Sequence, residues 1–364
     1  MADKAELLKD YEGKRDLYAS FATTVGALIS RLLHSDGIEL HSIGNRCKTI
    51  QSFKGKIDRK DGYECLEQIT DLAGVRLITH YEDDVDRVAE LIESEFSIDV
   101  ENSIDKRKAL DPDRFGYLSL HYVISLSEDR AALKEYQSFS GMKVEVQIRS
   151  ILQHTWAEIE HDTGYKSTVE VPKHIRRRFS RLAGLLELAD QEFIGIREAL
   201  QAYSQDVASK VESSAVTEVV DTYIDKVSLT KFLELDPFVL DLDLEIIKIL
   251  GVTSSPVDWD QAEADINRLK LVGVETLAQL KAALLANRGL VLARAKSIVE
   301  SRPPGKDVPR RALRKAISVL YLAQVLAVRN YNPDEASTVL KKMGFVGVDD
   351  IIASLVKVVS AESG

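Results

Sequence analysis

Residues 142–149 read Met-Lys-Val-Glu-Val-Gln-Ile-Arg, and this stretch decides the fold of the first half of the chain. Its apolar residues alternate with polar ones, which is typical of a β-strand with one buried face. Glu145 lies between Val144 and Val146 on what reads as a central strand, where an unpaired carboxylate is costly to bury. The pattern therefore predicts a strand that presents an acid to a functional site.

The flanking sequence supplies partners for this strand. Two further strands are predicted over 75–79 (VRLIT) and 118–126 (LSLHYVISL). Helical spacing of apolar residues predicts helices over 1–35, 83–96 and 150–162. Strands and helices that alternate in this way predict a domain that contains both kinds of element.

The second half of the chain has a different pattern. From Pro172 onward the spacing is helical, and one long amphipathic helix is predicted from His174. Residues 217–364 read as all-α, with a weak similarity between 269–277 and 343–351, each an apolar segment followed by Gly-Val and a helix start. We therefore predict a first domain over 1–215 and an all-α C-terminal domain over 216–364.

Composition limits the classes of protein. The 364 residues are 45% hydrophobic and 29% charged, which fits an ordinary globular protein of two or three domains. The chain has no apolar run of about 18 residues and a charged N-terminus, so we expect no membrane span and a cytoplasmic location. Its two cysteines, Cys47 and Cys65, do not suggest a disulfide framework. The net charge of −10 argues against nucleic-acid binding over the whole surface, although a local basic patch remains compatible with it.

Charged residues before and within the predicted sheet suggest a phosphate site. Arg46, Lys48 and Lys56 supply fixed positive charge of the kind that holds a triphosphate, although alone they read as a solvated basic face. Asp71 precedes the strand at 75–79, and together with Glu145 it has the chemistry to hold Mg²⁺ against phosphate oxygens. Taken alone, Asp71 reads as a strand-end acid that faces water.

An aromatic residue marks the start of the strand at 118–126. Residues 116–121 read Gly-Tyr-Leu-Ser-Leu-His, and an aromatic side chain next to a glycine at a strand end is able to stack on a nucleobase. Taken singly, Tyr117 reads as a core tyrosine.

Together these segments form an ordered set. They are R-x-K-x-x-x-S-x-x-x-K at 46–56, D-L-A-G-V-R at 71–76, G-Y-x-S-L-H at 116–121, K-V-E-V-Q-I-R at 143–149, and W-A-E-I-E-H with Y-K at 156–161 and 165–166. The set resembles the synthetase domain of the RelA/SpoT alarmone family. This resemblance implies an α+β fold, a mixed β-sheet flanked by helices that is nucleotidyltransferase-like. It also implies the transfer of pyrophosphate from ATP to the ribose 3′-hydroxyl of GDP or GTP, which makes (p)ppGpp and releases AMP.

The resemblance also implies roles for single residues. Arg46 and Arg76 would enclose the adenine of ATP, and Lys48, Ser52 and Lys56 would meet its phosphates. Asp71 and Glu145 would hold Mg²⁺, and Glu145 would accept the proton of the attacking hydroxyl. The acceptor side would comprise Tyr117, His121, Gln147, Arg149 and His154.

Two departures from the family pattern favour an alternative acceptor. The third position of the G-Y-x-S-L-H motif is usually basic but is Leu118 here, and a basic run from Lys173 to Arg181 follows the domain. Toxins of the same family transfer pyrophosphate to the 3′ end of tRNA and block translation, and some carry a C-terminal antitoxin module. The sequence leaves open the acceptor, the oligomeric state, and whether residues 216–364 control the enzyme intramolecularly.

Overall fold

The computed structural model describes residues 4–60, 62–105, 119–162, 172–213, 222–255, 259–301, 313–314 and 316–362. The chain divides into two compact units, Met1–Glu198 and Ala199–Gly364. The division falls inside one long helix, α6 (Lys173–Ser213). The boundary predicted at 215–216 lies outside the described residues.

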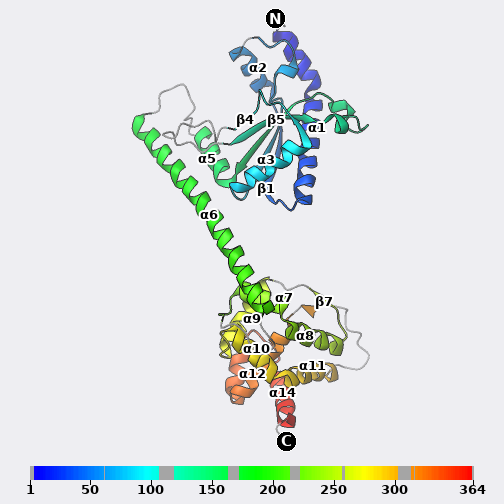
Figure 1. The fold of residues 1–364 in the computed structure, drawn as a ribbon, viewed down its shortest axis with the longest axis vertical. Coiled ribbons are helices and arrows are strands. Elements are labelled where there is room, and N and C mark those ends of the chain that lie inside the picture. Colours follow the sequence, from blue (N-terminus) through cyan, green and yellow to red (C-terminus); the bar gives the residue numbers. More distant parts are fainter. Residues whose placement is uncertain are drawn as a thin grey trace. The chain divides into compact units, whose positions relative to one another are not determined.

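The first unit is built on a mixed β-sheet flanked by helices, as predicted (Figure 1). The sheet order is β1-β2-β6-β5-β3, and β4 pairs with β5. This order places β6 in the centre, and within this sheet β2 and β6 are the only described pair that is parallel. The strands are β1 (Leu40–Cys47), β2 (Ala73–Thr79), β3 (Phe96–Ile98), β4 (Ile104–Asp105), β5 (Leu120–Leu126) and β6 (Val144–Ser150).

One face of this sheet is apolar and covered by helices. Val75, Val146 and Ile124 lie on this face, and they share a buried core with Phe21 of α1 and Val88 of α3. The burial of these side chains stabilises the unit through the hydrophobic effect. The helices of the unit before α6 are α1 (Lys4–Ser35), α2 (Ile50–Arg59), α3 (Asp83–Glu95), α4 (Glu128–Ala131) and α5 (Ile151–Asp162).

The opposite face of the sheet carries the polar side chains. Alternate residues of a strand point to opposite faces, so the burial of Val144 and Val146 directs Glu145 to the other side. Arg46 of β1, Gly74 of β2 and Glu145 of β6 are direct neighbours across three strands. The predicted strand and its acid are therefore confirmed in position.

The segment before β2 differs from the prediction. No strand was predicted before residue 75, but Arg46 lies on β1, which pairs with β2 in antiparallel register. The sequence Leu40–Cys47, LHSIGNRC, has few β-branched residues, so its strand conformation depends on pairing with β2 rather than on local propensity. Lys48 follows directly, and its backbone N–H donates to the Leu72 carbonyl at 2.9 Å.

Part of α6 belongs to the first unit and packs against it. Phe179 contacts the ring of Trp156 on α5, with the ring centroids 5.4 Å apart. Asp190 is almost fully buried and accepts a hydrogen bond at 2.8 Å from Ser150, the last residue of β6. Arg197 pairs with Asp83 at the start of α3. These contacts fix α6 to α5, to the end of β6 and to α3 within the first unit.

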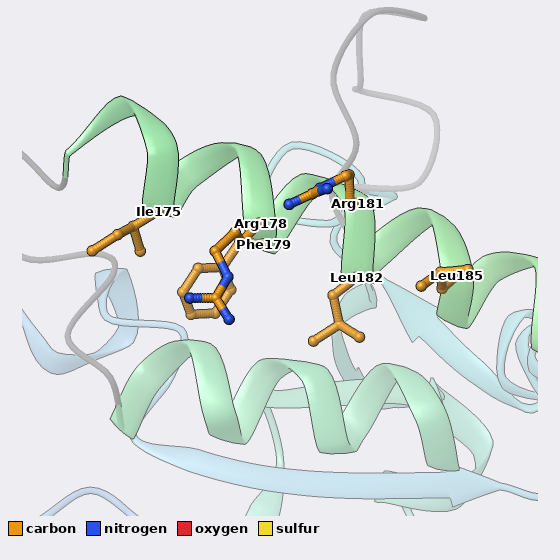
Figure 2. A pocket seen from close by; sticks show the side chains of 6 residues that line it. All are labelled: Ile175, Arg178, Phe179, Arg181, Leu182 and Leu185. Carbon is orange, nitrogen blue, oxygen red and sulfur yellow. The ribbon is translucent and has the colours of Figure 1, made fainter.

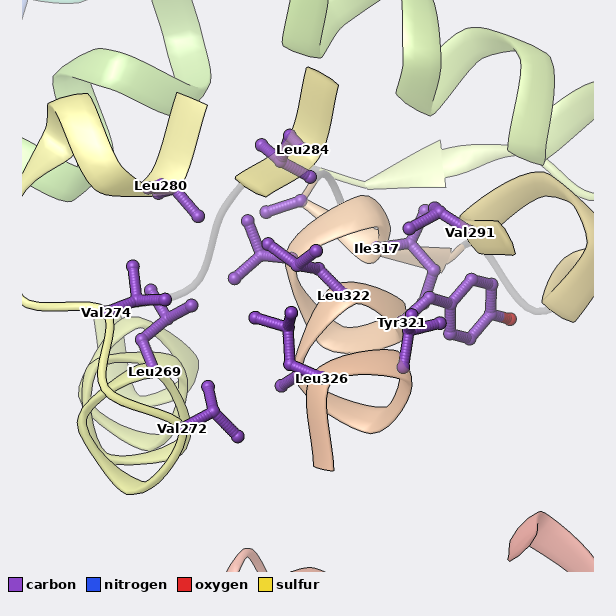
Figure 3. Close-up of a cluster of buried hydrophobic side chains, with 14 of the residues drawn as sticks. Leu269, Val272, Val274, Leu280, Leu284, Val291, Ile317, Tyr321, Leu322 and Leu326 are labelled. Atoms are coloured by element: carbon purple, nitrogen blue, oxygen red, sulfur yellow. The ribbon is translucent and has the colours of Figure 1, made fainter. Parts of the chain in front are cut away.

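The second unit is helical, as predicted, apart from two short strands. Its core gathers side chains of α9, α10, α11 and α12 (Figure 3). The helix α12 is buried along most of its length, and its first backbone N–H groups, from Ala316 and Ser318, donate to the buried carboxylate of Asp243. Its elements are α7 (Lys226–Leu235), α8 (Pro237–Leu250), β7 (Ser254–Ser255), α9 (Trp259–Leu271), α10 (Leu277–Ala286), α11 (Arg288–Glu300), β8 (Leu313–Arg314), α12 (Ile317–Asn330), α13 (Pro333–Lys342) and α14 (Val348–Glu362).

The two similar segments of the second unit are both helix–turn–helix connections. Gly273 lies between α9 and α10 with φ of 79°, and its counterpart Gly347 lies between α13 and α14 with φ of 64°, a conformation that glycine adopts without strain. The two connections touch, because Arg268 donates to the Met343 carbonyl at 3.2 Å. Within the described residues, no helix has the length and apolarity needed to cross a membrane.

Candidate active site

The polar face of the sheet carries a chain of charged side chains centred on Glu145. Arg46 Nη2 lies 2.9 Å from one carboxylate oxygen of Glu145, and Gln147 donates to the same oxygen at 2.9 Å. His121 Nδ1 lies 3.2 Å from the other oxygen. Three strands thus supply the partners of one acid, and the lateral register of β1, β2, β6 and β5 brings them together.

Glu145 is held as an anion. Burial by itself would raise its pKa, but the hydrogen bonds from His121 and Gln147 and the charges of His121 and Arg46 outweigh burial and lower the pKa to about 2. The carboxylate is therefore ionised at neutral pH. This agrees with the expectation that an acid on a central strand requires partners.

Gly74 makes the contact between Arg46 and Glu145 possible. Arg46 lies on β1 and Glu145 on β6, so the Arg46 side chain must cross β2 at the position of Gly74. A Cβ at Gly74 would lie 2.8 Å from Arg46 Nε and 3.0 Å from Arg46 Cγ, which is closer than van der Waals contact allows. The glycine of the D-L-A-G-V-R motif therefore keeps a path open across the sheet.

A second acid lies at the start of β2. Asp71 forms ion pairs with Lys48 at 2.8 Å and with Lys56 at 2.7 Å. Burial would raise the pKa of Asp71, but the hydrogen bonds and charges of the two lysines lower it below its usual value. Both lysines are positioned by local structure, because Lys48 extends β1 and Lys56 lies on α2.

Ser52 lies in the first turn of α2. Thr49 is the N-cap of this helix, and its hydroxyl accepts a hydrogen bond from the Ser52 backbone N–H at 3.1 Å. Ser52 and Lys56 are four residues apart, so they share one face of the helix. The N-terminal end of a helix also favours anionic groups.

A third group of side chains lies at the far end of the same face. Arg76 Nη1 lies 3.0 Å from Glu158 Oε1, and Glu158 and His154 are four residues apart on α5. Arg149 follows Gln147 on β6 and donates to its amide oxygen at 3.2 Å. The hydrogen bonds from Glu145 through Gln147 to Arg149 connect this end with the centre of the site.

This far end has buried nitrogens that face no acceptor. Among the described residues, Arg149 Nε and His154 Nδ1 are buried without a hydrogen-bond partner. Burial and then the charge of Arg76 lower the pKa of both groups. Buried polar atoms without partners are rare in proteins, so these two nitrogens favour a hydrogen-bond partner that a ligand would supply.

The structure thus gathers most of the residues that the sequence suggested. Tyr117 lies outside the described residues, and its predicted role stays a prediction. Glu158 was not among the predicted residues. The sequence did contain an indication of Glu158, because its spacing from His154 places both residues on one helix face. The spacing alone does not show which strand that face meets.

Asp71 and Glu145 are compatible with a Mg²⁺ ion. Both are ionised carboxylates beside cationic side chains that suit phosphate groups. Mg²⁺ in nucleotide sites is typically held by one or two carboxylates together with substrate phosphates. The described residues contain no cluster of three or more metal-ligating side chains, so this donor set would need the substrate to complete it.

A pocket of about 470 Å³ lies beside α6 in the first unit (Figure 2). Its lining is apolar apart from Arg178 and Arg181, and the side chains drawn all come from α6. None of the predicted site residues that the structure describes lines this pocket. We therefore place the candidate active site on the sheet and not in this pocket.

Comparison with known proteins identifies relatives of the first unit. Residues 45–170 match the profile described as "Region found in RelA / SpoT proteins". The chain is 29% identical over 158 residues to the GTP pyrophosphokinase YwaC of Bacillus subtilis, covering 42% of this chain and 72% of that protein. It is 28% identical over 184 residues to the GTP pyrophosphokinase YjbM of the same organism, covering 49% and 82%.

Solved structures include similar chains. The crystal structure of small alarmone synthetase 2 from Bacillus subtilis aligns with a TM-score of 0.43 at 25% identity, over 52% of this chain and 99% of that chain. The structure of small alarmone synthetase 1 from the same organism, bound to its product pppGpp, aligns with a TM-score of 0.44 at 23% identity, over 52% and 98%. The match over residues 45–170 assigns a RelA/SpoT region to the first unit, and the charged residues on the polar face of the sheet lie within this region.

Proposed function

We propose that the chain is an ATP-dependent pyrophosphotransferase that moves the β,γ-pyrophosphate of ATP to the ribose 3′-hydroxyl of GDP or GTP. The observation that carries this proposal is the lateral row of Arg46, Gly74 and Glu145, in which a guanidinium group and an ionised acid meet on the polar face of the sheet. The relatives named GTP pyrophosphokinases support the same reaction.

The spacing of two arginines suits the adenine of ATP. Arg46 lies opposite Gly74, and Arg76 follows Gly74 by two residues on the same strand face. Residues two apart on a strand are separated by roughly 6.6 Å. A flat ring needs roughly 3.5 Å on each side, so an adenine fits between the two guanidinium groups. The phosphates would then extend towards Lys48, Lys56 and the first turn of α2, where Ser52 lies.

Glu145 is the proposed proton acceptor. In the transfer, the 3′-oxygen bonds to the β-phosphorus of ATP, the bond from that phosphorus to the α-phosphate oxygen breaks, and AMP leaves. Glu145 would take the proton of the attacking hydroxyl. The pKa of about 2 makes it a weak base in the substrate-free state. Arg46 would weaken its hold on Glu145 when it engages ATP, which would raise the basicity of the acid at the time of transfer.

A bound Mg²⁺ would neutralise charge on the phosphates, with Asp71 and Glu145 as the protein ligands. On the acceptor side, His121 and Gln147 lie beside Glu145, and Arg149 and His154 supply the buried nitrogens without partners. Tyr117 is the proposed stacking residue for the guanine. We assign this activity to the first unit and a regulatory or interaction role to the second, and a cytoplasmic location is consistent with these substrates.

The second candidate function is transfer to the 3′ end of tRNA, as in the toxins of this family. Arg177, Arg178 and Arg181 are exposed at the start of α6, which packs on the helix that carries His154. Exposed arginines next to an acceptor site suit the phosphate backbone of a nucleic acid. In that case the C-terminal half is a candidate antitoxin or sensor.

One experiment separates the two candidates. The purified full chain is incubated with ATP labelled on the γ-phosphate, Mg²⁺ and either GDP, GTP or bulk tRNA, and the labelled species is identified. Label in the guanosine nucleotide with release of AMP supports the first proposal, and label at the tRNA 3′ end supports the second. No label in any acceptor contradicts both.

A further inference from the structure

We infer that Glu158 is a positioning residue that orients Arg76 for the adenine of the donor nucleotide. This inference rests on the proposed function, because it assigns a task to Arg76 within the ATP site. Glu158 is neither a predicted metal ligand nor a predicted base. It is the acid that α5 brings to the far end of the charged face.

The orientation of α5 explains why Glu158 reaches Arg76. Trp156 and Gln153 point to the interior, where Trp156 packs on Phe179 and Gln153 bonds to the end of β6. His154 and Glu158 therefore share a different side of the helix, which faces β2. Glu158 Oε1 lies 3.0 Å from Arg76 Nη1 and 3.8 Å from His154 Nδ1.

The charges around Arg76 give Glu158 its importance. After burial, the charges of Arg76 and Arg46 lower the pKa of Arg149, so each of these two guanidinium groups lies close enough to repel that of Arg149. Glu145 pairs with Arg46, whereas Glu158 pairs with Arg76 and also raises the pKa of Arg149. Without Glu158, Arg76 would lose its counter-charge and tend to turn away from the other two arginines.

Ion pairing and base stacking use different parts of an arginine. The carboxylate of Glu158 meets Arg76 at a terminal nitrogen, on the edge of the planar guanidinium. A nucleobase stacks on the face of that plane. The two contacts are compatible, so Glu158 is able to hold Arg76 in place while adenine is bound. An acid that occupied the place of the nucleotide would instead have to release Arg76 when the nucleotide binds.

This distinction sets the expected results. If Glu158 positions Arg76, then Glu158→Ala weakens binding of the ATP analogue AMPCPP by about threefold to fivefold, the range for a partly exposed ion pair. Glu158→Gln keeps an oxygen that accepts from Arg76 and stays within twofold of the wild type. Binding of inorganic tripolyphosphate, which has no base, is not weakened in either variant.

The experiment is calorimetric titration of the full chain with AMPCPP and with tripolyphosphate. The variants are Glu158→Ala, Glu158→Gln, Arg76→Ala and the double variant Arg76→Ala/Glu158→Ala. The control is Glu90→Ala, which removes an exposed acid of α3 on the other face of the sheet. Melting temperatures are recorded for each, and α5 tolerates changes at Glu158 because that side chain is 55% exposed.

Loss of AMPCPP affinity in Glu158→Ala, and no additional loss when Arg76 is already alanine, supports the inference. Equal or tighter AMPCPP binding in Glu158→Ala overturns it, because the acid then only opposes the nucleotide charge. A loss that persists in the Arg76→Ala background also overturns it. If the wild type binds no AMPCPP, the proposed function fails instead, so the two failures are distinguishable.

Discussion

Replacement of Gly74 by alanine tests the geometry on which the proposed site depends. The new Cβ would lie 2.8 Å from Arg46 Nε and 3.0 Å from Arg46 Cγ. Carbon contacts are favourable at roughly 3.5–4.0 Å, so the methyl group overlaps the Arg46 side chain by roughly half an ångström or more. The overlap involves Cγ, close to the Arg46 backbone, so movement of the guanidinium alone cannot relieve it. Arg46 must adopt a different rotamer and lose its 2.9 Å contact with Glu145.

The expected effect on stability is small or favourable. Gly74 is absent from the described glycines with positive φ, so alanine fits its backbone conformation. Gly→Ala at such a position stabilises a protein by about 0.4–1 kcal/mol through the unfolded state. The lost ion pair offsets this by less than about 1 kcal/mol, because the Arg46 side chain is half exposed. The melting temperature should therefore stay within a few degrees of the wild type.

The expected effect on activity is large. Stacking of a base on a side chain contributes about 1–3 kcal/mol, so displacement of Arg46 should raise the KM for ATP at least fivefold. The assay is steady-state transfer of labelled pyrophosphate with ATP varied at saturating acceptor. Gly13→Ala, on α1 with open space around its new Cβ, is the control. A Gly74→Ala enzyme with wild-type KM and kcat would refute the reasoning, as would a further loss when Gly74→Ala is added to Arg46→Ala.

Three further predictions follow from the same structure. Glu145→Gln should lower turnover more than tenfold and leave the melting temperature nearly unchanged, because the amide neither accepts the proton nor binds metal well. A variant that keeps more than about a tenth of wild-type turnover would exclude Glu145 as the base. Burial and then the charge of Glu82 raise the pKa of Asp190 to about 7, so the folded state holds this proton more tightly than the unfolded chain. Stability should thus fall as pH rises from about 4 to about 7, by at most about 4 kcal/mol, and stay level above. Denaturant titrations of Asp190→Asn from pH 5 to 8 should show a free energy of unfolding without this fall. A variant whose free energy of unfolding depends on pH as in the wild type would contradict the prediction. Charge reversal of Arg177, Arg178 and Arg181 should abolish transfer to tRNA but leave transfer to GDP nearly unchanged. Transfer to tRNA by the wild type should fall steeply with added salt. Equal loss with both acceptors would show that these arginines support the fold.

The central strand and its acid were predictable from the sequence because local pattern and tertiary role agree there. Val144, Glu145 and Val146 alternate along a buried strand, and any acid in that position must find partners. The edge strand β1 was not predictable in this way. Its residues have weak strand propensity, and only pairing with β2 makes them a strand, so Arg46 and Lys48 were recognised as cations but not as neighbours across a sheet.

Glu158 and Asp190 show a second limit of sequence reasoning. Both are acids on amphipathic helices, where a charged residue normally indicates a solvated face. Glu158 instead meets Arg76, and Asp190 is almost fully buried against Ser150. Which side of a helix faces a sheet depends on packing with other elements, here Trp156 against Phe179, and the helical period does not contain that information.

Gly74 shows both limits of sequence reasoning. In the sequence it is one letter of a motif between apolar residues, with no charge and no turn to explain it. In the sheet it separates a cation on β1 from an acid on β6, and the absence of a side chain is what lets them meet. The motif D-L-A-G-V-R therefore encodes three functions within six residues. Asp71 gathers the two lysines, Gly74 opens the path for Arg46, and Arg76 lies one strand repeat further along the same face, where α5 supplies its counter-charge.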